Sequence, residues 1–138
     1  MGIDIAAAQE FLRGHHHAVL ATTRGDGRPQ LSPVLAVVDD TGRVLISTRA
    51  AAIKVRHLHR DPRATLLVLS DGFFGDWVQV EGTAEIVTLP EAMDLLVDYY
   101  RRAAGEHANW DDYRAAMVDQ RRVVVRLAIE RAGPNVSG

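Results

Sequence analysis

One segment of the chain constrains the fold more than any other. Between Trp77 and Val87 the side chains alternate between apolar and polar, and this period of two predicts a β-strand that is buried on one face. The expected core face carries Val78, Val80, Gly82, Ala84 and Ile86, and the opposite face carries Trp77, Gln79, Glu81, Thr83 and Glu85. A strand with this pattern belongs to a sheet with a hydrophobic core on one side.

Turn signals divide the rest of the chain into short elements. Asp26-Gly27 and the segment 39–42 predict hairpin turns, because Asp-Gly supplies the positive φ angles that tight turns need. Further strands are predicted over 17–23, 28–38, 43–48, 64–70 and 122–129, and helices over 3–13, 50–60, 90–104 and 111–119. The strand over 28–38 contains Pro29 and Pro33, so it is expected at a sheet edge or bulged near Ser32-Pro33.

About six antiparallel strands and three or four helices predict a mainly β fold with flanking helices, a Greek-key barrel with the helices packed outside. The 138 residues contain no internal repeat and no linker, so a single domain over 1–138 is expected. A barrel this small fills its interior with its own side chains. A large ligand is therefore expected at an edge or between subunits.

Composition excludes several classes of function. With 16 basic and 18 acidic residues, the net charge of −2 argues against a nucleic-acid-binding surface. The chain has no cysteine, which excludes disulfides, iron–sulfur clusters and thiol catalysis. Charged residues interrupt the first apolar segment, and no apolar run approaches the ~18 residues of a membrane span. A cytoplasmic protein without membrane contact is expected.

The histidines and serines do not form a recognisable catalytic or metal motif. In the run 15–17, only His15 and His17 would share a strand face, and no carboxylate completes a ligand set at suitable spacing. His57 and His59 are two residues apart on a predicted helix and do not face each other. The Gly-x-Ser-x-Gly pattern of serine hydrolases is absent. No metal site is predicted, and no catalytic residue is assigned.

The segment 47–56 is the best local candidate for a binding site. Ser47 or Thr48 could cap the helix that follows, and a helix N-terminus favours a phosphate. Arg49 stands at its start, and Lys54, the single lysine beside 15 arginines, lies about one turn further. Both could reach one anion. An ordinary capped helix with solvated charges is the alternative interpretation.

Four stretches together resemble the pyridoxamine-phosphate-oxidase-like split-barrel family, particularly the branch that uses the deazaflavin coenzyme F420. They span most of the chain in order and comprise residues 19–32, 54–64, 80–84 and 100–123. The first and third are general to split barrels. The second, with Lys54-Val55-Arg56-His57-Leu58, and the fourth, with Gly105-Glu106-His107, point to the F420 branch.

The resemblance implies a homodimer with two cofactors in grooves at the subunit interface. It assigns the cofactor phosphate to Ser47, Thr48, Arg49, Lys54 and Arg56, and the ring to Gln30, Leu31, Ser32, Pro33 and Val34. The partner subunit is expected to contribute the region of Trp77 and Gln79. Relatives often carry an additional arginine where this chain has Ala51-Ala52, so either Arg49 replaces it or the anionic tail is held less tightly.

The expected function is that of an F420-dependent reductase, which moves a hydride between reduced F420 and a small organic acceptor. Such a reaction needs no protein nucleophile, since the cofactor carries the difficult step. An FMN-dependent oxidase or reductase of the same fold is an alternative, because FMN and F420 share a ribityl phosphate. A non-catalytic F420-binding protein is a further alternative.

Overall fold

The computed structural model of the protein describes residues 3–133. The strands are β1 (His17–Thr23), β2 (Pro29–Leu35), β3 (Val37–Val38), β4 (Val44–Arg49), β5 (Arg63–Leu69), β6 (Trp77–Val87) and β7 (Arg122–Ala132). They form one seven-stranded antiparallel sheet in the order β2-β1-β5-β6-β7-β4-β3. The helices are α1 (Ile5–Gly14), α2 (Ile53–Arg60), α3 (Ala92–Ala104) and α4 (Trp110–Asp119).

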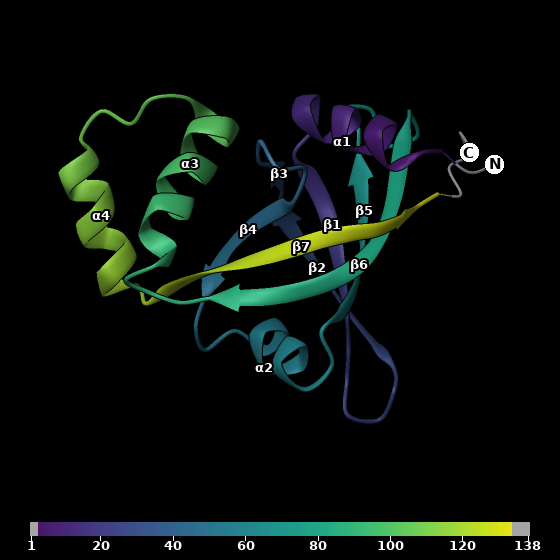
Figure 1. Ribbon diagram of the computed structural model, residues 1–138, viewed down its shortest axis with the longest axis horizontal. Helices are drawn as coiled ribbons and strands as arrows, with labels where there is room; N and C mark the ends of the chain where they lie inside the picture. The colour runs from purple at the N-terminus through teal and green to yellow at the C-terminus, as the bar shows by residue number, and fades with distance from the viewer. Residues whose placement is uncertain (1–2, 134–138) are drawn as a thin grey trace.

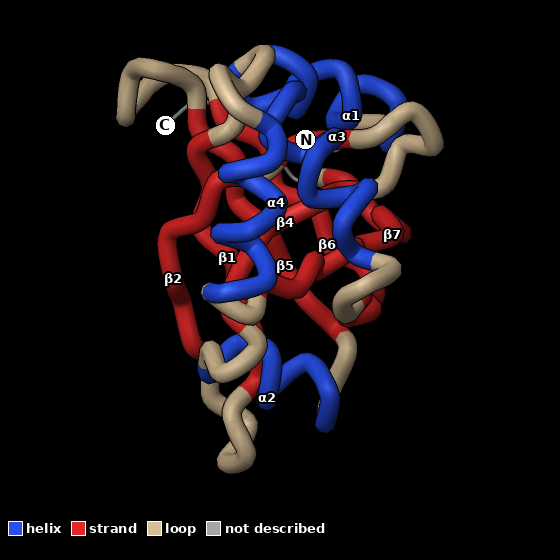
Figure 2. Tube along the Cα trace, turned by 90° about the vertical axis from the view of Figure 1, so that its left-hand side faces the viewer, coloured by secondary structure: helices blue, strands red, loops and turns tan. Residues whose placement is uncertain are grey.

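The sheet curls into an open barrel, and helices cover its ends and one flank (Figure 1). α1 lies over one end and α2 over the other, whereas α3 and α4 pack together beside β4 and β7. Figure 2 shows β2 at the outer margin of the strands, with α2 below the barrel. The predicted class, a mainly β split barrel with flanking helices, is confirmed, although the sheet has seven strands instead of six.

Two hydrophobic clusters hold these layers together. One fills the barrel and joins Leu12 of α1 to sheet residues such as Leu66. The other lies between the sheet and the α3–α4 pair and includes Leu45 and Leu96. Since Ile46 belongs to the first cluster and Leu45 to the second, β4 is buried on both faces. The strand predicted over 77–87 has its exact bounds, and its valine-bearing face is buried as expected.

The strand predicted over 28–38 is broken at Ala36, and the bulge expected near Ser32-Pro33 is absent. β2 runs in regular register along β1, with Pro33 opposite Val19. Beyond Ala36 the chain leaves β1 and pairs with β4 as β3, with Val37 opposite Leu45. One bent segment therefore joins the two ends of the sheet and supplies the additional strand.

The predicted edge position of this segment is confirmed, because β2 has β1 as its sole neighbour in the described sheet. Ala36 donates its N–H to the carbonyl oxygen of His16 at 2.8 Å. Antiparallel ladders alternate, so the even-numbered residues of β2 bond to β1 and the odd-numbered residues direct their backbone groups outward. Pro29 and Pro33 occupy odd positions. The N–H groups that proline lacks are therefore ones that the β1–β2 ladder would not use.

Helix α2 begins later than the sequence predicts. Ser47, Thr48 and Arg49 remain in β4, where they pair with β7, so Ser47 and Thr48 are not helix caps. Ala52 takes the N-cap position and contributes no side-chain cap. The long-range ladder with β7 has therefore overridden the local capping signal. The other helix and strand ends differ from the predicted ones by at most three residues.

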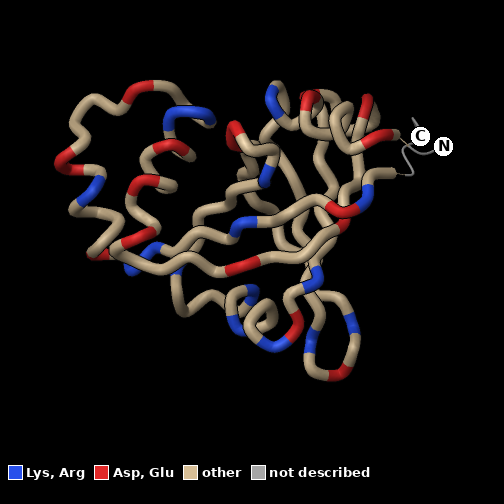
Figure 3. The backbone as a smooth tube through the Cα atoms, in the orientation of Figure 1, with Lys and Arg blue, Asp and Glu red and all other residues tan. Residues whose placement is uncertain are grey.

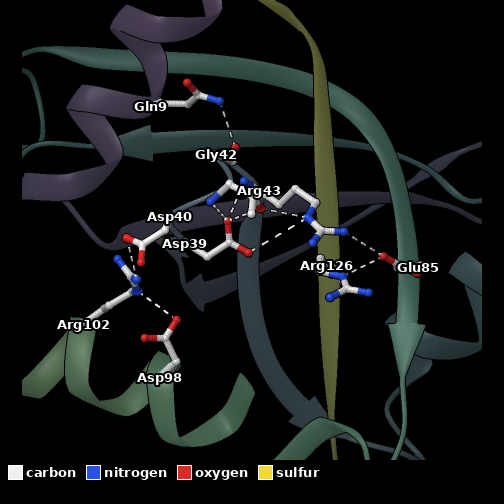
Figure 4. A network of polar contacts seen from close by, with 10 residues as sticks. Gln9, Asp39, Asp40, Gly42, Arg43, Glu85, Asp98, Arg102 and Arg126 are labelled. Carbon is white, nitrogen blue, oxygen red and sulfur yellow. Dashed lines mark hydrogen bonds and ion pairs between the residues drawn. The ribbon is translucent and has the colours of Figure 1, made fainter. Parts of the chain in front are cut away.

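A polar network fixes the turn between β3 and β4 (Figure 4). The Asp39 carboxylate accepts the Thr41 N–H at 2.8 Å, the Thr41 hydroxyl at 2.7 Å and the Arg43 N–H at 3.0 Å. Gln9 of α1 donates its amide to the Gly42 carbonyl oxygen at 3.0 Å. Burial raises the pKa of Asp39, but the hydrogen bonds from Thr41 and Arg43 outweigh burial and leave the pKa below its ordinary value.

Asp39→Ala is expected to lower the free energy of unfolding by about 1–3 kcal/mol at pH 7, because the N–H groups of Thr41 and Arg43 lose their acceptor. The folded-state pKa is depressed from 3.8, so this contribution is fully present above that value. It is lost as the pH falls through the folded-state pKa. Urea unfolding between pH 7 and pH 2 measures both effects.

Asp40→Ala is the matched control for Asp39→Ala. The carboxylate of Asp40 pairs with Arg102 at 3.0 Å on the surface, so its loss should change stability by less than about 0.5 kcal/mol. Equal destabilisation by the two substitutions, or a deficit in Asp39→Ala that persists unchanged below pH 3, would contradict the role given to Asp39.

Candidate functional site

β2 and β4 present free strand edges to each other. Within residues 3–133, β2 has a strand neighbour on one side, and β3 covers β4 at Val44 and Leu45 alone. The two strands nevertheless approach each other in space. Free edges carry backbone donors and acceptors that no ladder uses, so this split in the barrel offers hydrogen bonds to a ligand.

The loop after β4 leads directly into an uncapped helix N-terminus. Ala50 donates its N–H to the Arg121 carbonyl oxygen at 2.8 Å, which holds the loop against the start of β7. Ala52, the N-cap residue of α2, has no side-chain acceptor for the first N–H groups of the helix. Lys54 is the second residue of α2 and is partly buried. Free N–H groups, the positive end of the helix dipole and a lysine in the first turn together suit a phosphate.

Basic side chains are concentrated around the end of the barrel that α2 covers (Figure 3). Figure 3 shows lysine and arginine positions on α2 and on the β1–β2 turn beside it, whereas acidic positions are frequent on α3 and α4. Arg49 and Arg56 are exposed. Among the ion pairs of the described residues, none involves Arg49, Lys54 or Arg56. These three side chains are therefore free to bind an anion.

Arg121 and Arg122 belong to the same basic region, and the sequence analysis did not assign them to the site. Arg122 stands directly opposite Arg49 in the β4–β7 register, an arrangement that is unfavourable for like charges. Arg121 has a φ of 52°, in the left-handed region that few non-glycine residues adopt. Arg49 and Arg121 line a hollow of about 460 Å³. The register between two distant strands creates this cluster, and the signal in the sequence is the Arg121-Arg122 pair that begins the last strand.

The five residues expected to contact the cofactor ring divide between the two faces of β2. Leu31 and Pro33 are exposed on the outer face, whereas Gln30, Ser32 and Val34 are partly buried on the barrel side. A flat ring on one face cannot contact all five side chains. A ring at the free edge of β2 would instead meet the backbone of the whole segment.

Trp77 and Gln79 lie on the outer face of the sheet, as their alternation predicts. Gln79 pairs with Leu67 of β5, and Leu67 pairs with Val19 of β1. The strand order places β6 three strands from β2, about 14 Å at a spacing of about 4.8 Å. Trp77 and Gln79 are thus far from the β2 edge of their own chain, so only a second chain could bring them to a ligand there.

Two of the histidines hold parts of the fold together. Nδ1 of buried His57 lies 3.0 Å from the hydroxyl oxygen of Thr22, which ties α2 to β1. Nδ1 of His16 lies 3.0 Å from the Ala36 carbonyl oxygen, at the bend between β2 and β3. Among residues 3–133 there is no group of three His, Asp or Glu side chains placed to hold a metal ion.

Comparison with known proteins establishes the family. Residues 5–134 match the pyridoxamine 5'-phosphate oxidase family, and the chain belongs to it. The curled seven-stranded sheet is the split barrel of that family, an oxidoreductase fold that binds flavin-type cofactors.

Three solved structures show the range of proteins that share this fold. The conserved hypothetical protein Rv2991 from Mycobacterium tuberculosis is 30% identical, with a TM-score of 0.77 over 94% of this chain and 82% of its own. An F420 reductase is 20% identical, with a TM-score of 0.69 over 91% of this chain and 94% of its own. The haem storage protein HutZ from Vibrio cholerae is 18% identical, with a TM-score of 0.70 over 100% and 98% of the two chains.

The helices of residues 3–133 are all too short or too polar to cross a lipid bilayer. A hollow of about 560 Å³ opens on the outer sheet face and is lined by residues that include Ala21, Thr65 and Glu81. It is separate from the basic hollow beside Arg49 and Arg121.

Proposed function

We propose that the protein is a cytoplasmic F420-dependent reductase, which transfers a hydride between reduced F420 and a small organic acceptor and works as a homodimer. The observation that carries this proposal is the cluster of Arg49, Lys54 and Arg56 around the uncapped N-terminus of α2, none of them in an ion pair within the described structure. The F420 branch is favoured by the stretches 54–64 and 100–123, and a solved F420 reductase has the same fold.

The residues of the chain bind and orient the cofactor. Lys54 acts as a point charge on the phosphate, and Arg49 provides a planar fork that can bond two oxygens. The first N–H groups of α2 complete the phosphate site. The free edge of β2 offers backbone groups to the ring. When F420 is bound, its ring supplies the hydride, so the protein needs no nucleophile of its own.

FMN is the alternative cofactor, because its ribityl phosphate would meet the same cations. A non-catalytic F420-binding protein is the alternative outside the enzymes. Titration with F420 and FMN side by side, followed by turnover assays with conjugated acceptors, distinguishes the three. The proposal expects tighter binding of F420 and oxidation of reduced F420 by an acceptor. Tighter binding of FMN, or F420 binding without turnover on any acceptor, would favour one of the alternatives.

Lys54→Ala is expected to weaken cofactor binding by about 1.5–3 kcal/mol, the range of a hydrogen bond to a charged group. Isothermal titration with F420 measures this loss. Arg13→Ala is the control, since it also removes one positive charge but lies on α1, at the opposite end of the barrel (Figure 1). A dissociation constant that Lys54→Ala leaves unchanged would refute the phosphate site.

The outer face of β2, β1, β5 and β6 supports the proposed dimer. The strand registers place Pro33, Val19 and Leu67 in one row across this face, with Leu31 and Leu35 beside them on β2. Leu31 is 59% exposed and Leu35 is 38% exposed. Apolar faces of this kind mark interaction sites. A second copy bound here would bring its Trp77 and Gln79 toward the cofactor of the first, which one chain alone cannot do.

Leu31→Glu is expected to convert a dimer, of twice 15.2 kDa, into a monomer at micromolar concentration. The carboxylate would have to be buried in the interface without a partner. Val118→Glu is the matched control, because Val118 is also 59% exposed but lies on α4. Light scattering distinguishes the two species. A wild-type mass near 15.2 kDa would refute the dimer.

Trp77 is expected to report cofactor binding through its fluorescence. If the partner's Trp77 lies beside the cofactor, F420 should quench emission, and Trp77→Phe should remove most of the response. The remaining tryptophan, Trp110, packs against Tyr100 and Tyr113 in the α3–α4 pair. A response carried entirely by Trp110 would place the cofactor elsewhere.

A further inference from the structure

The β3–β4 ladder ends one hydrogen-bonded pair before it would join β2 to β4 and close the split in the barrel. Val37 lies opposite Leu45 and Val38 opposite Val44, and Asp39 donates its N–H to the Arg43 carbonyl oxygen at 2.9 Å. Hydrogen-bonded pairs recur at every second residue of an antiparallel ladder. Continued past Ala36, this register would place Leu35 opposite Ser47 as the next hydrogen-bonded pair.

Ser47 has the correct orientation for that missing pair. The bond from the Ala50 N–H to the Arg121 carbonyl oxygen defines the hydrogen-bonded pairs of the β4–β7 ladder. By alternation, Ser47 and Val124 form a pair that is not hydrogen-bonded, so the backbone groups of Ser47 point away from β7. They point toward the open side of β4, where Leu35 would be its partner.

The hydroxyl of Tyr99 occupies this position instead. Tyr99 lies on α3, and its hydroxyl donates to the Leu35 carbonyl oxygen at 2.9 Å. Burial raises the pKa of Tyr99, while the Ser47 backbone N–H and the charge of Arg122 act in the opposite direction. The raised pKa keeps the phenol protonated at neutral pH, so its hydroxyl can donate to the Leu35 carbonyl oxygen, with the Ser47 N–H near its oxygen.

We infer that the Tyr99 hydroxyl is an inserted rung, that is, a side-chain group that takes the place of one backbone hydrogen bond of a ladder. It replaces the direct bond between Ser47 and Leu35 and keeps β2 apart from residues 47–49 of β4. The direct bond would extend the β3–β4 ladder into β2 and cover the free edges. With the hydroxyl in place, the Leu35 carbonyl oxygen has a donor and the Ser47 N–H has the phenol oxygen nearby, while the two strands stay apart.

The effect of the inserted rung on a bound cofactor rests on the proposed function. The split is where the ring of the cofactor would meet the β2 edge, so Tyr99 is a positioning residue that sets the width available to the ring. The hydrophobic contacts of α3 with β4 fix the helix that carries it, because Leu96 and Leu45 belong to one buried cluster.

Tyr99→Phe tests the inserted rung, and Tyr113→Phe is the matched control. Tyr113 also donates its hydroxyl to a backbone carbonyl, that of Leu96, at 2.7 Å, but within the α3–α4 pair. Hydrogen exchange at the Ser47 amide measures the rung, and titration with F420 and FMN measures the ring site. In Tyr99→Phe the Ser47 amide should exchange at least fivefold differently from wild type, faster if the split stays open and slower if the strands pair. Cofactor affinity should fall at least fivefold.

The outcomes separate this inference from the proposed function. Unchanged Ser47 exchange in Tyr99→Phe, or an equal change in Tyr113→Phe, would overturn the inserted rung. Altered exchange with unchanged affinity would overturn its link to the ligand. If the wild-type protein binds neither F420 nor FMN, the proposed function fails, and Ser47 exchange still decides the role of Tyr99.

Discussion

The hydrogen bond from Ala36 to His16 is the constraint on which the site depends. It is the last rung of the β1–β2 ladder, and directly after it the chain joins β4 as β3. The barrel is therefore closed at residues 37–38, where β3 pairs with β4, and open where β2 faces β4. Had the segment remained straight along β1, β4 would have lacked its short partner strand. Had it followed β4 throughout, β1 would have become the edge, and there would be no pair of facing free edges.

Charge is arranged to match this geometry. The chain as a whole carries a small negative charge, which favours no anion. The basic residues at the β4–α2 connection are concentrated locally, and Arg49 and Arg122 face each other across a ladder where opposite charges would be more stable. A protein tolerates such a pairing where the structure over-determines it or where a ligand neutralises it. The same region has the uncapped start of α2, so two independent features favour an anion at one place.

The sequence predicted features that depend on neighbouring residues and missed those that depend on distant ones. The strand over 77–87 follows from its period of two alone. Pro29 and Pro33 predicted an edge strand or a bulge, and the structure has the edge strand. Ser47 and Thr48 have the local chemistry of helix caps, but the ladder with β7, some 75 residues away in sequence, keeps them in a strand. The position of Tyr99 between two strands depends on three elements at once. No local pattern distinguishes it from Tyr100, which packs in the aromatic cluster of the α3–α4 pair.

Both prolines of β2 stand at odd-numbered positions, whose backbone groups face outward, and this placement affects how the protein behaves in a crowded solution. An edge strand with all its outward N–H groups would recruit a strand from another molecule, the first step toward amyloid-like stacking. Pro29 and Pro33 remove two of the outward donors and leave the inward ladder intact. An incoming strand would find alternate hydrogen bonds missing, whereas a small ring needs only one or two of the remaining groups. The edge can thus stay open to a ligand without becoming a template for aggregation.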